Sequence, residues 1–233
     1  AICDDFADRK LYIADGHHRY ETAINYRNYC RENNIYAPGS EYVMMMLVDM
    51  AHPGLVVFPT HRLIKKLEHF DEQALLLNCE DYFTVEKKDS ITGIEHELSR
   101  LYEEGKKAFA YYSGGSAWTL LTLKSLTIME KILPEKSEAS RQLDVSILHN
   151  LVLERILGID KENMANQKNL QYTRSLEEAI EEVQKGKSQC AFILNPTRVS
   201  EIGAVAAAGE KMPQKSTYFY PKLITGLVMN ALD

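Results

Sequence analysis

Residues 169–195, "NLQYTRSLEEAIEEVQKGKSQCAFILN", combine two kinds of hydrophobic spacing. The runs "NLQYTR" and "QCAFILN" are short and apolar, as β-strands are, whereas "SLEEAIEEVQKG" repeats its apolar residues at helical spacing, with Ser175 as the expected N-cap. A second helix is expected in "VSEIGAVAAAG", residues 199–209. This β-α-β-α series predicts an α/β (or α+β) protein in which a mixed sheet carries helices on its faces.

The same spacing rules give the elements expected over the rest of the chain. Helices are expected over 17–34, 71–80, 91–105 and 143–159. Strands are expected over 11–14, 41–50, 54–60, 81–88 and 216–220, and a hairpin over 107–123 that turns at Gly114 and Gly115. A tentative boundary in the polar stretch 133–142 gives two lobes, 1–132 and 143–233, which we expect to form one compact unit. The start at Ala1, close to the first expected strand, suggests a fragment of a longer chain.

Composition limits the class of protein. With 233 residues, 45% of them hydrophobic, the chain can bury a sizeable core. The net charge of −6 argues against nucleic acid as the main partner, and the apolar windows are too short to cross a bilayer. Four scattered cysteines, Cys3, Cys30, Cys79 and Cys190, are expected to be reduced thiols. We therefore expect a cytoplasmic protein with no membrane partner, and the sequence leaves its oligomeric state open.

The turn "DGHHR", Asp15 to Arg19, concentrates charge where the expected first strand meets a helix. The first N–H groups of a helix attract anions, Gly16 permits close approach, Arg19 offers a fork of donors, and His17 or His18 can donate a bond or move a proton. This chemistry suits a phosphate group. In a plainer interpretation Asp15 only caps the helix while the basic side chains are solvated or pair with Glu21. A third is a metal site of Asp15, Glu21 and one histidine.

Two further polar motifs adjoin expected strands. In "FPTHRL", His61 and Arg62 are expected on a loop at the carboxyl end of a strand, where α/β sheets tend to bind ligands. The stretch "GEKMPQKSTYFYPK", residues 209–222, concentrates positive charge beside Ser216 and Thr217, from Lys211, Lys215 and Lys222. Glutamine at 214, a proline at 213 and the order of elements exclude a P-loop there.

Three stretches carry a family resemblance: "IADGHHRYETAINYR", "FPTHRL" and "MPQKSTYFYPKLITGL". They resemble the family catalogued as domain of unknown function 1015, and their order spans nearly the whole chain. The turn from Gly16 to Arg19 is similar to the phosphate-binding turn of the ParB/sulfiredoxin-like superfamily, and free-serine kinases within it carry a comparable turn. The resemblance implies that Asp15, His18 and Arg19 handle phosphate or metal.

The expected site is one pocket where the three motifs converge, and its ligand is a small phosphorylated molecule. We expect ATP or ADP (or pyrophosphate) with Mg²⁺, and phosphotransferase activity, in one version like that of a free-serine kinase. Asp15, which would also hold Mg²⁺, and His18 are the expected catalytic residues. The ligand-binding residues expected are Gly16, His17, Arg19, His61, Arg62, Lys215, Ser216 and Thr217. A metal-dependent hydrolase and a non-catalytic nucleotide-binding module remain the alternatives.

Overall fold

The chain folds into two compact units in a computed structural model that describes residues 2–222, 226 and 228–232. Unit 1 comprises Ala1–Val56 and Phe219–Asp233, and unit 2 comprises Val57–Tyr218. The lobes expected from the sequence, 1–132 and 143–233, are composed differently, because each contributes residues to both units. Part of the third motif, residues 223–225 and 227, lies outside the described residues.

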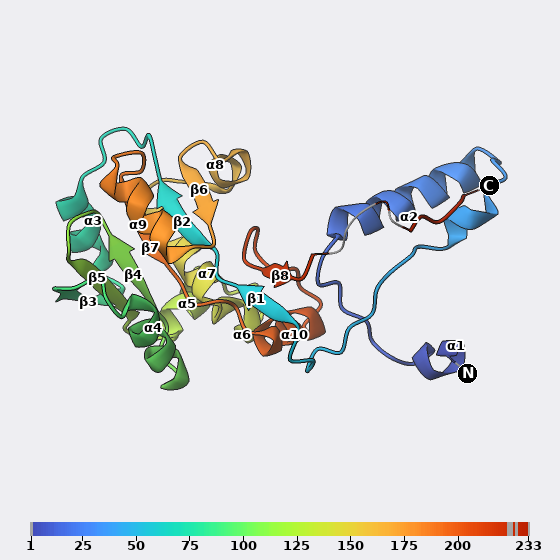
Figure 1. The fold of residues 1–233 in the computed structure, drawn as a ribbon, viewed down its shortest axis with the longest axis horizontal. Coiled ribbons are helices and arrows are strands. Elements are labelled where there is room, and N and C mark those ends of the chain that lie inside the picture. Colours follow the sequence, from blue (N-terminus) through green and yellow to red (C-terminus); the bar gives the residue numbers. More distant parts are fainter. Residues whose placement is uncertain (1, 223–225, 227, 233) are drawn as a thin grey trace. The chain divides into compact units, whose positions relative to one another are not determined.

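Unit 2 is built on a six-stranded sheet with the order β3-β5-β4-β7-β2-β6 (Figure 1). Its strands are β2 (His61–Ile64), β3 (Phe83–Lys88), β4 (Ala108–Tyr112), β5 (Trp118–Leu123), β6 (Leu170–Thr173) and β7 (Cys190–Ile193). All five neighbouring pairs are antiparallel. The α/β class is thus confirmed, whereas the sheet is antiparallel and not mixed.

The antiparallel order follows from where each crossover helix returns the chain. Helix α9 (Leu176–Gln184) links β6 to β7, but β2 lies between these two strands and is antiparallel to both. Likewise α4 (Ile94–Glu103) links β3 to β4, with β5 between them. Each half of the sheet is therefore a β-α-β unit split by an inserted strand, so strands that run parallel are never neighbours.

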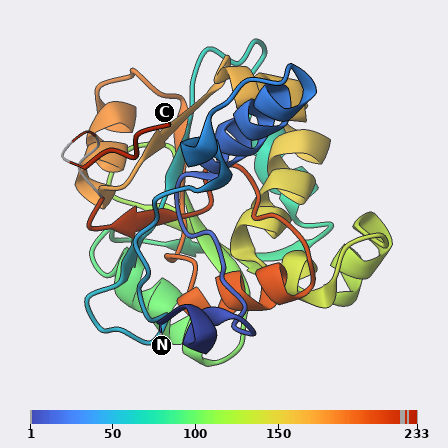
Figure 2. The same ribbon diagram turned by 90° about the vertical axis from the view of Figure 1, so that its right-hand side faces the viewer.

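Alternation along the strands divides the core into two layers. On one face Leu63, Ala110 and Leu120 pack with residues of α4 and α9. On the other face Ile64 and Phe109 pack with apolar residues from several other helices of unit 2. Figure 2 gives a side view, with α9 in orange and the helical segment η2 in yellow on opposite sides of the strands. Unit 2 is therefore a three-layer structure with a buried sheet.

The other helices of unit 2 were predicted in part, since no helix was expected over residues 127–132, 138–141 or 161–166. They are α3 (Glu72–Cys79), α5 (Thr127–Ile132), α6 (Glu138–Arg141), α7 (Asp144–Ile147), the π-helix η2 (Leu148–Ile156), α8 (Lys161–Asn166) and α10 (Val199–Ala207). The single helix expected over 143–159 is divided into α7 and η2. Ser175 caps α9 as predicted, since its Oγ accepts a bond of 3.1 Å from the amide of Glu178.

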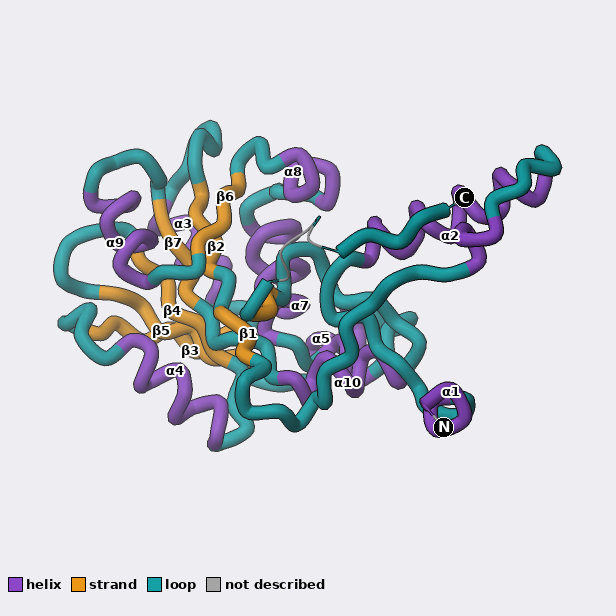
Figure 3. Tube along the Cα trace, turned by 45° about the vertical axis from the view of Figure 1, so that its right-hand side comes forward, coloured by secondary structure: helices purple, strands orange, loops and turns teal. Residues whose placement is uncertain are grey.

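Unit 1 contains mainly helix and loop. Its elements are α1 (Ile2–Phe6), α2 (His17–Glu32) and the 3₁₀-helix η1 (Pro38–Glu41). Strands β1 (Val56–Phe58) and β8 (Tyr218–Tyr220) form a two-stranded sheet, and each contains a point where the chain passes between units. Helix α2 was predicted correctly, but the strands expected over 11–14 and 41–50 are wrong: residues 11–14 and 42–50 are loop or turn, teal in Figure 3, and Glu41 ends η1. A strand needs a neighbour for its backbone hydrogen bonds, and no described strand pairs with them.

Unit 1 buries little apolar surface. Among the described residues, Cys30 and Phe219 are its buried apolar side chains. Leu11, Tyr12, Ile13 and the run from Met44 to Val48 are exposed. A two-bond ion pair, in which Arg31 donates to Glu41 at 2.9 and 2.6 Å, links α2 to η1. Helix formation and polar contacts therefore stabilise unit 1 more than a hydrophobic core does.

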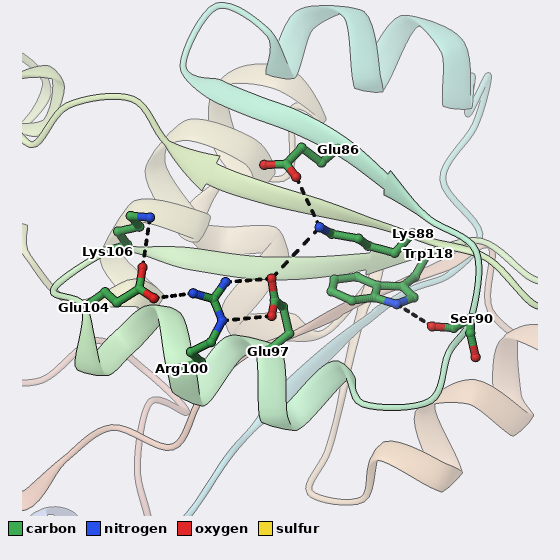
Figure 4. A network of polar contacts seen from close by, with 8 residues as sticks. All are labelled: Glu86, Lys88, Ser90, Glu97, Arg100, Glu104, Lys106 and Trp118. Atoms are coloured by element: carbon green, nitrogen blue, oxygen red, sulfur yellow. Dashed lines mark hydrogen bonds and ion pairs between the residues drawn. The ribbon is translucent and has the colours of Figure 1, made fainter.

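Surface charges on α4 pair with one another (Figure 4). Arg100 donates to Glu97 at 3.0 and 3.1 Å and also pairs with Glu104, while Lys88 pairs with Glu86 at 3.1 Å. These side chains are partly exposed and screened by solvent, so we assign them to the solvated surface. No helix in the described part of the chain combines the length and the apolar character needed to cross a membrane.

Candidate functional site

The DGHHR turn leads directly into α2, the 16-residue helix of unit 1. Gly16 is the N-cap residue and has φ 86°, the left-handed region that glycine adopts without strain. In the described structure no side chain caps this helix, and its first turn holds no acidic residue. Helices α3, α6, α8 and α9 have Asp71, Ser137, Asp160 and Ser175 as caps, whereas α4, like α2, starts at a left-handed glycine without a side-chain cap. The first amides of α2 are thus left for a ligand or water.

Two cations contact Asp15 beside this helix start. Lys222 Nζ lies 2.5 Å from Oδ1 of Asp15, and Arg19 Nη2 lies 3.4 Å from its Oδ2. The Arg19 side chain folds back over Gly16, where an added Cβ would meet Nη2 at 3.0 Å. Asp15 therefore orients the cations and does not cap the helix, contrary to the plainer interpretation of the sequence. Lys222 was not among the predicted site residues, because only the fold brings it to Asp15.

The two histidines of the turn are solvent-facing. His18 Nδ1 lies 3.6 Å from Glu21 Oε2, and its side chain is fully exposed; His17 is exposed as well. The pairing expected at helical spacing therefore forms through His18. No group of three or more histidine, cysteine, aspartate or glutamate side chains suited to a metal ion occurs among the described residues.

The second motif is placed differently from the prediction. His61 and Arg62 begin β2 between β6 and β7 and are buried, so the expected loop position is wrong. Two adjacent polar residues are typical of a loop, but here both lie inside unit 2, where Arg62 is fully hydrogen-bonded and the buried Nε2 of His61 has no hydrogen-bond partner among the described residues. Arg62 donates to His149 Nε2, at 3.1 and 3.3 Å, and to the carbonyls of Thr60 and Lys215. Burial lowers the pKa of Arg62 to about 10.

The imidazole of His61 is neutral at pH 7. Its Nδ1 accepts a bond of 3.3 Å from the amide of Leu194. Burial and the charge of Arg62 lower its pKa to about 4. The same two causes lower the pKa of His149 well below its usual value. Arg62 is thus surrounded by neutral acceptors.

The third motif is tied to unit 2 by its main chain. The carbonyl of Lys215 accepts from Arg62 at 3.0 Å, and that of Ser216 accepts from Thr197 Oγ1 at 3.0 Å. Ser216 is buried and donates to the carbonyl of Pro213 at 2.6 Å, whereas the Lys215 side chain is exposed and Thr217 half-buried. The predicted strand over 216–220 is shorter, Tyr218–Tyr220. The second and third motifs therefore meet through Arg62 and Lys215.

A small polar pocket of unit 2 was not predicted. It is narrow, with room for little more than one water molecule, and is lined by Thr60, Arg62, Asp144, Val145, Leu194, Asn195, Pro196, Thr197, Glu201 and Ser216. Burial raises the pKa of Asp144 to about 7, against the opposing charge of Lys107, whose ammonium lies 3.8 Å away. Lys107 also pairs with Glu201 at 3.2 Å. Lys107, Asp144 and Glu201 are far apart in the sequence, so no motif predicted this network.

The chain is similar to a protein family and to several solved structures. Residues 1–146 match the family described as "Protein of unknown function (DUF1015)". No curated protein sequence gave a match. Among solved structures, a conserved hypothetical protein from Pyrococcus furiosus is 17% identical with a TM-score of 0.46, covering 89% of this chain and 68% of that one. A free serine kinase in complex with AMP is 18% identical with a TM-score of 0.46, covering 89% and 66%. This chain spans about two thirds of their length.

Proposed function

The chain belongs to the family described as "Protein of unknown function (DUF1015)", and on that premise we propose that it binds a phosphorylated small molecule at the turn from Asp15 to Arg19. The match covers this turn and the second motif. The observation that supports the proposal most is the uncapped start of α2 with Arg19 held over Gly16.

The donors at this turn match the chemistry of a phosphate group. The helix start offers backbone N–H groups and the positive end of the helix dipole. Arg19 has five N–H donors, and its bond to Asp15 uses one of them. A phosphate has several acceptor oxygens and negative charge, so it can accept from both sources at once. Water or a neutral ligand would gain less from the same donors.

The finer proposal is that the ligand is a nucleotide, ATP or ADP, and that its phosphoryl group is transferred. It rests on the resemblance of the Gly16 to Arg19 turn to phosphate-binding turns, with the free-serine kinases as one example. His18 would move a proton, and Asp15 would hold Mg²⁺, since a carboxylate oxygen suits that ion. Bound Mg²⁺ would neutralise charge on the transferred group.

The remaining predicted residues stay part of the proposal in different roles. His61 and Arg62 are buried, and Arg62 donates to the carbonyl of Lys215 in the third motif, so we propose that they order unit 2 and do not contact the ligand themselves. Ser216 and the main chain at Lys215 are held by contacts within unit 2, and ligand contacts of the exposed Lys215 side chain and of Thr217 stay a prediction.

A calorimetric screen tests this function. The 233-residue chain is titrated with ATP, ADP, CTP and pyrophosphate, with and without Mg²⁺, and then incubated with ATP or ADP and free serine. We expect saturable binding of at least one of these ligands and, with a kinase activity, formation of phosphoserine. Binding without turnover would favour the non-catalytic module, and no binding of any of them would contradict the proposal.

A further inference from the structure

The carboxylate of Asp15 lies between two cationic side chains that come from opposite ends of the chain. Lys222 reaches Oδ1 at 2.5 Å and Arg19 reaches Oδ2 at 3.4 Å. Each oxygen of the carboxylate therefore has its own cation. All three residues belong to unit 1, and the contact joins the first motif to the third.

A carboxylate in this position resembles one edge of a phosphate group. Both present two oxygens and negative charge to donors that lie side by side. The uncapped amides of α2 begin at the next residues, so Asp15 balances part of the positive charge that an incoming anion would meet. With the carboxylate of Asp15 included, the three side chains carry a net charge of +1.

We propose that Asp15 is an internal substitute for the phosphate and that the ligand displaces it, taking Lys222 as its second cationic contact beside Arg19. This inference rests on the proposed function and adds a binding residue and a regulatory one to the same site. Displacement frees the carboxylate of Asp15, which can then contact Mg²⁺.

The exchange is feasible because the ion pairs are only partly buried. The side chains of Asp15, Lys222 and Arg19 are 46%, 37% and 61% exposed. Solvent screens such pairs, so opening them costs little. A phosphate carries more charge than a carboxylate and can gain the helix amides as well, so it competes well for the same cations.

Titration of pyrophosphate into the full chain in metal-free buffer tests the inference. Asp15→Asn keeps the size of the side chain and removes its charge, so it should lower the dissociation constant about three- to ten-fold. Lys222→Ala should raise it about five- to ten-fold. Lys222→Gln, which keeps most of the apolar stem, should act in the same direction. Lys185→Ala, which removes one positive charge at the C-terminal end of α9 in unit 2, is the control and should leave the constant unchanged.

The outcomes separate this inference from the proposed function. If the parent binds pyrophosphate and Arg19→Ala weakens it, but Asp15→Asn binds no tighter or both Lys222 variants bind like the parent, the displacement is wrong and the phosphate site stands. A parent that binds none of the screened ligands overturns both. Circular dichroism confirms that each variant is folded before its constant is compared.

Discussion

The guanidinium of Arg62, in strand β2, donates a hydrogen bond of 3.0 Å to the carbonyl of Lys215, 153 residues later in the chain. Arg62 is 1% exposed, and its other partners are His149 Nε2 and the carbonyl of Thr60. Its guanidinium also lies 5.3 Å from the ring of Tyr172. A buried cation here organises neutral acceptors from several parts of unit 2.

Replacing Arg62 with methionine should therefore destabilise unit 2 by about 3 kcal/mol, because the carbonyls of Thr60 and Lys215 and the buried His149 lose their donor. The free energy of unfolding is measured in denaturant through the fluorescence of Trp118, the single tryptophan, which lies in unit 2. Arg100→Ala removes an arginine from the surface of α4 and should change stability little. Equal effects of the two substitutions would refute this role of Arg62.

The sequence predicted several elements of unit 2 correctly because their spacing reflects local geometry. The helix α9 with its cap Ser175 and the hairpin of β4 and β5 depend on neighbours in the sequence. The buried position of Arg62 was missed because its partners, His149 and the carbonyl of Lys215, are distant in the chain. The contact of Lys222 with Asp15 was missed for the same reason.

The strands expected in unit 1 were wrong for a different reason. Residues 11–14 and 41–50 are apolar enough for strands, but hydrophobic spacing cannot show whether a neighbouring strand is present. The described residues supply none for them. The convergence of the DGHHR turn with the other predicted ligand-binding residues stays a prediction.

Stability should depend on pH through His61. Its folded pKa is about 4, below the ordinary value of about 6.5, so the unfolded chain binds the proton more readily. Its contribution is present above pH 6.5 and is lost as the pH falls toward 4. When the pH falls from 7 to 5, the free energy of unfolding should fall by about 2 kcal/mol more in the parent than in His61→Gln, as measured by Trp118 fluorescence. An identical loss in both proteins would contradict a neutral buried imidazole.

Asp144 should act in the opposite direction. Burial raises its pKa to about 7 despite Lys107 and Arg198, and Glu201 raises it further. The folded chain therefore binds this proton more readily, so its contribution is complete below about pH 4 and is lost as the pH rises toward 7. When the pH falls from 7 to 5, the free energy of unfolding of the parent should rise by about 2 kcal/mol relative to that of Asp144→Asn, because asparagine binds no proton in this range. Parallel pH profiles of parent and variant would show that Asp144 is ionised throughout.

Gly16 should tolerate alanine poorly. With φ at 86° a Cβ is strained, and it would also meet Arg19 Nη2 at 3.0 Å. Gly105 is the matched control, since it has φ 73° and open space around the added Cβ. Gly105→Ala should show the strain alone, about 1 kcal/mol, whereas Gly16→Ala should also displace Arg19 and weaken pyrophosphate binding. Amide exchange measures the strain, in α2 for Gly16→Ala and in α4 for Gly105→Ala, and calorimetry measures binding. Unchanged binding by Gly16→Ala would argue against the role of Arg19.

The most direct test of the phosphate site compares Arg19→Ala with His17→Ala in the calorimetric titration of pyrophosphate. Arg19 is a permanent cation with a fork of donors, whereas a neutral histidine has one N–H donor. The account predicts that Arg19→Ala raises the dissociation constant about ten-fold or more, that His17→Ala has a smaller effect, and that both variants melt like the parent. Binding of pyrophosphate by Arg19→Ala as tight as by the parent would contradict the account.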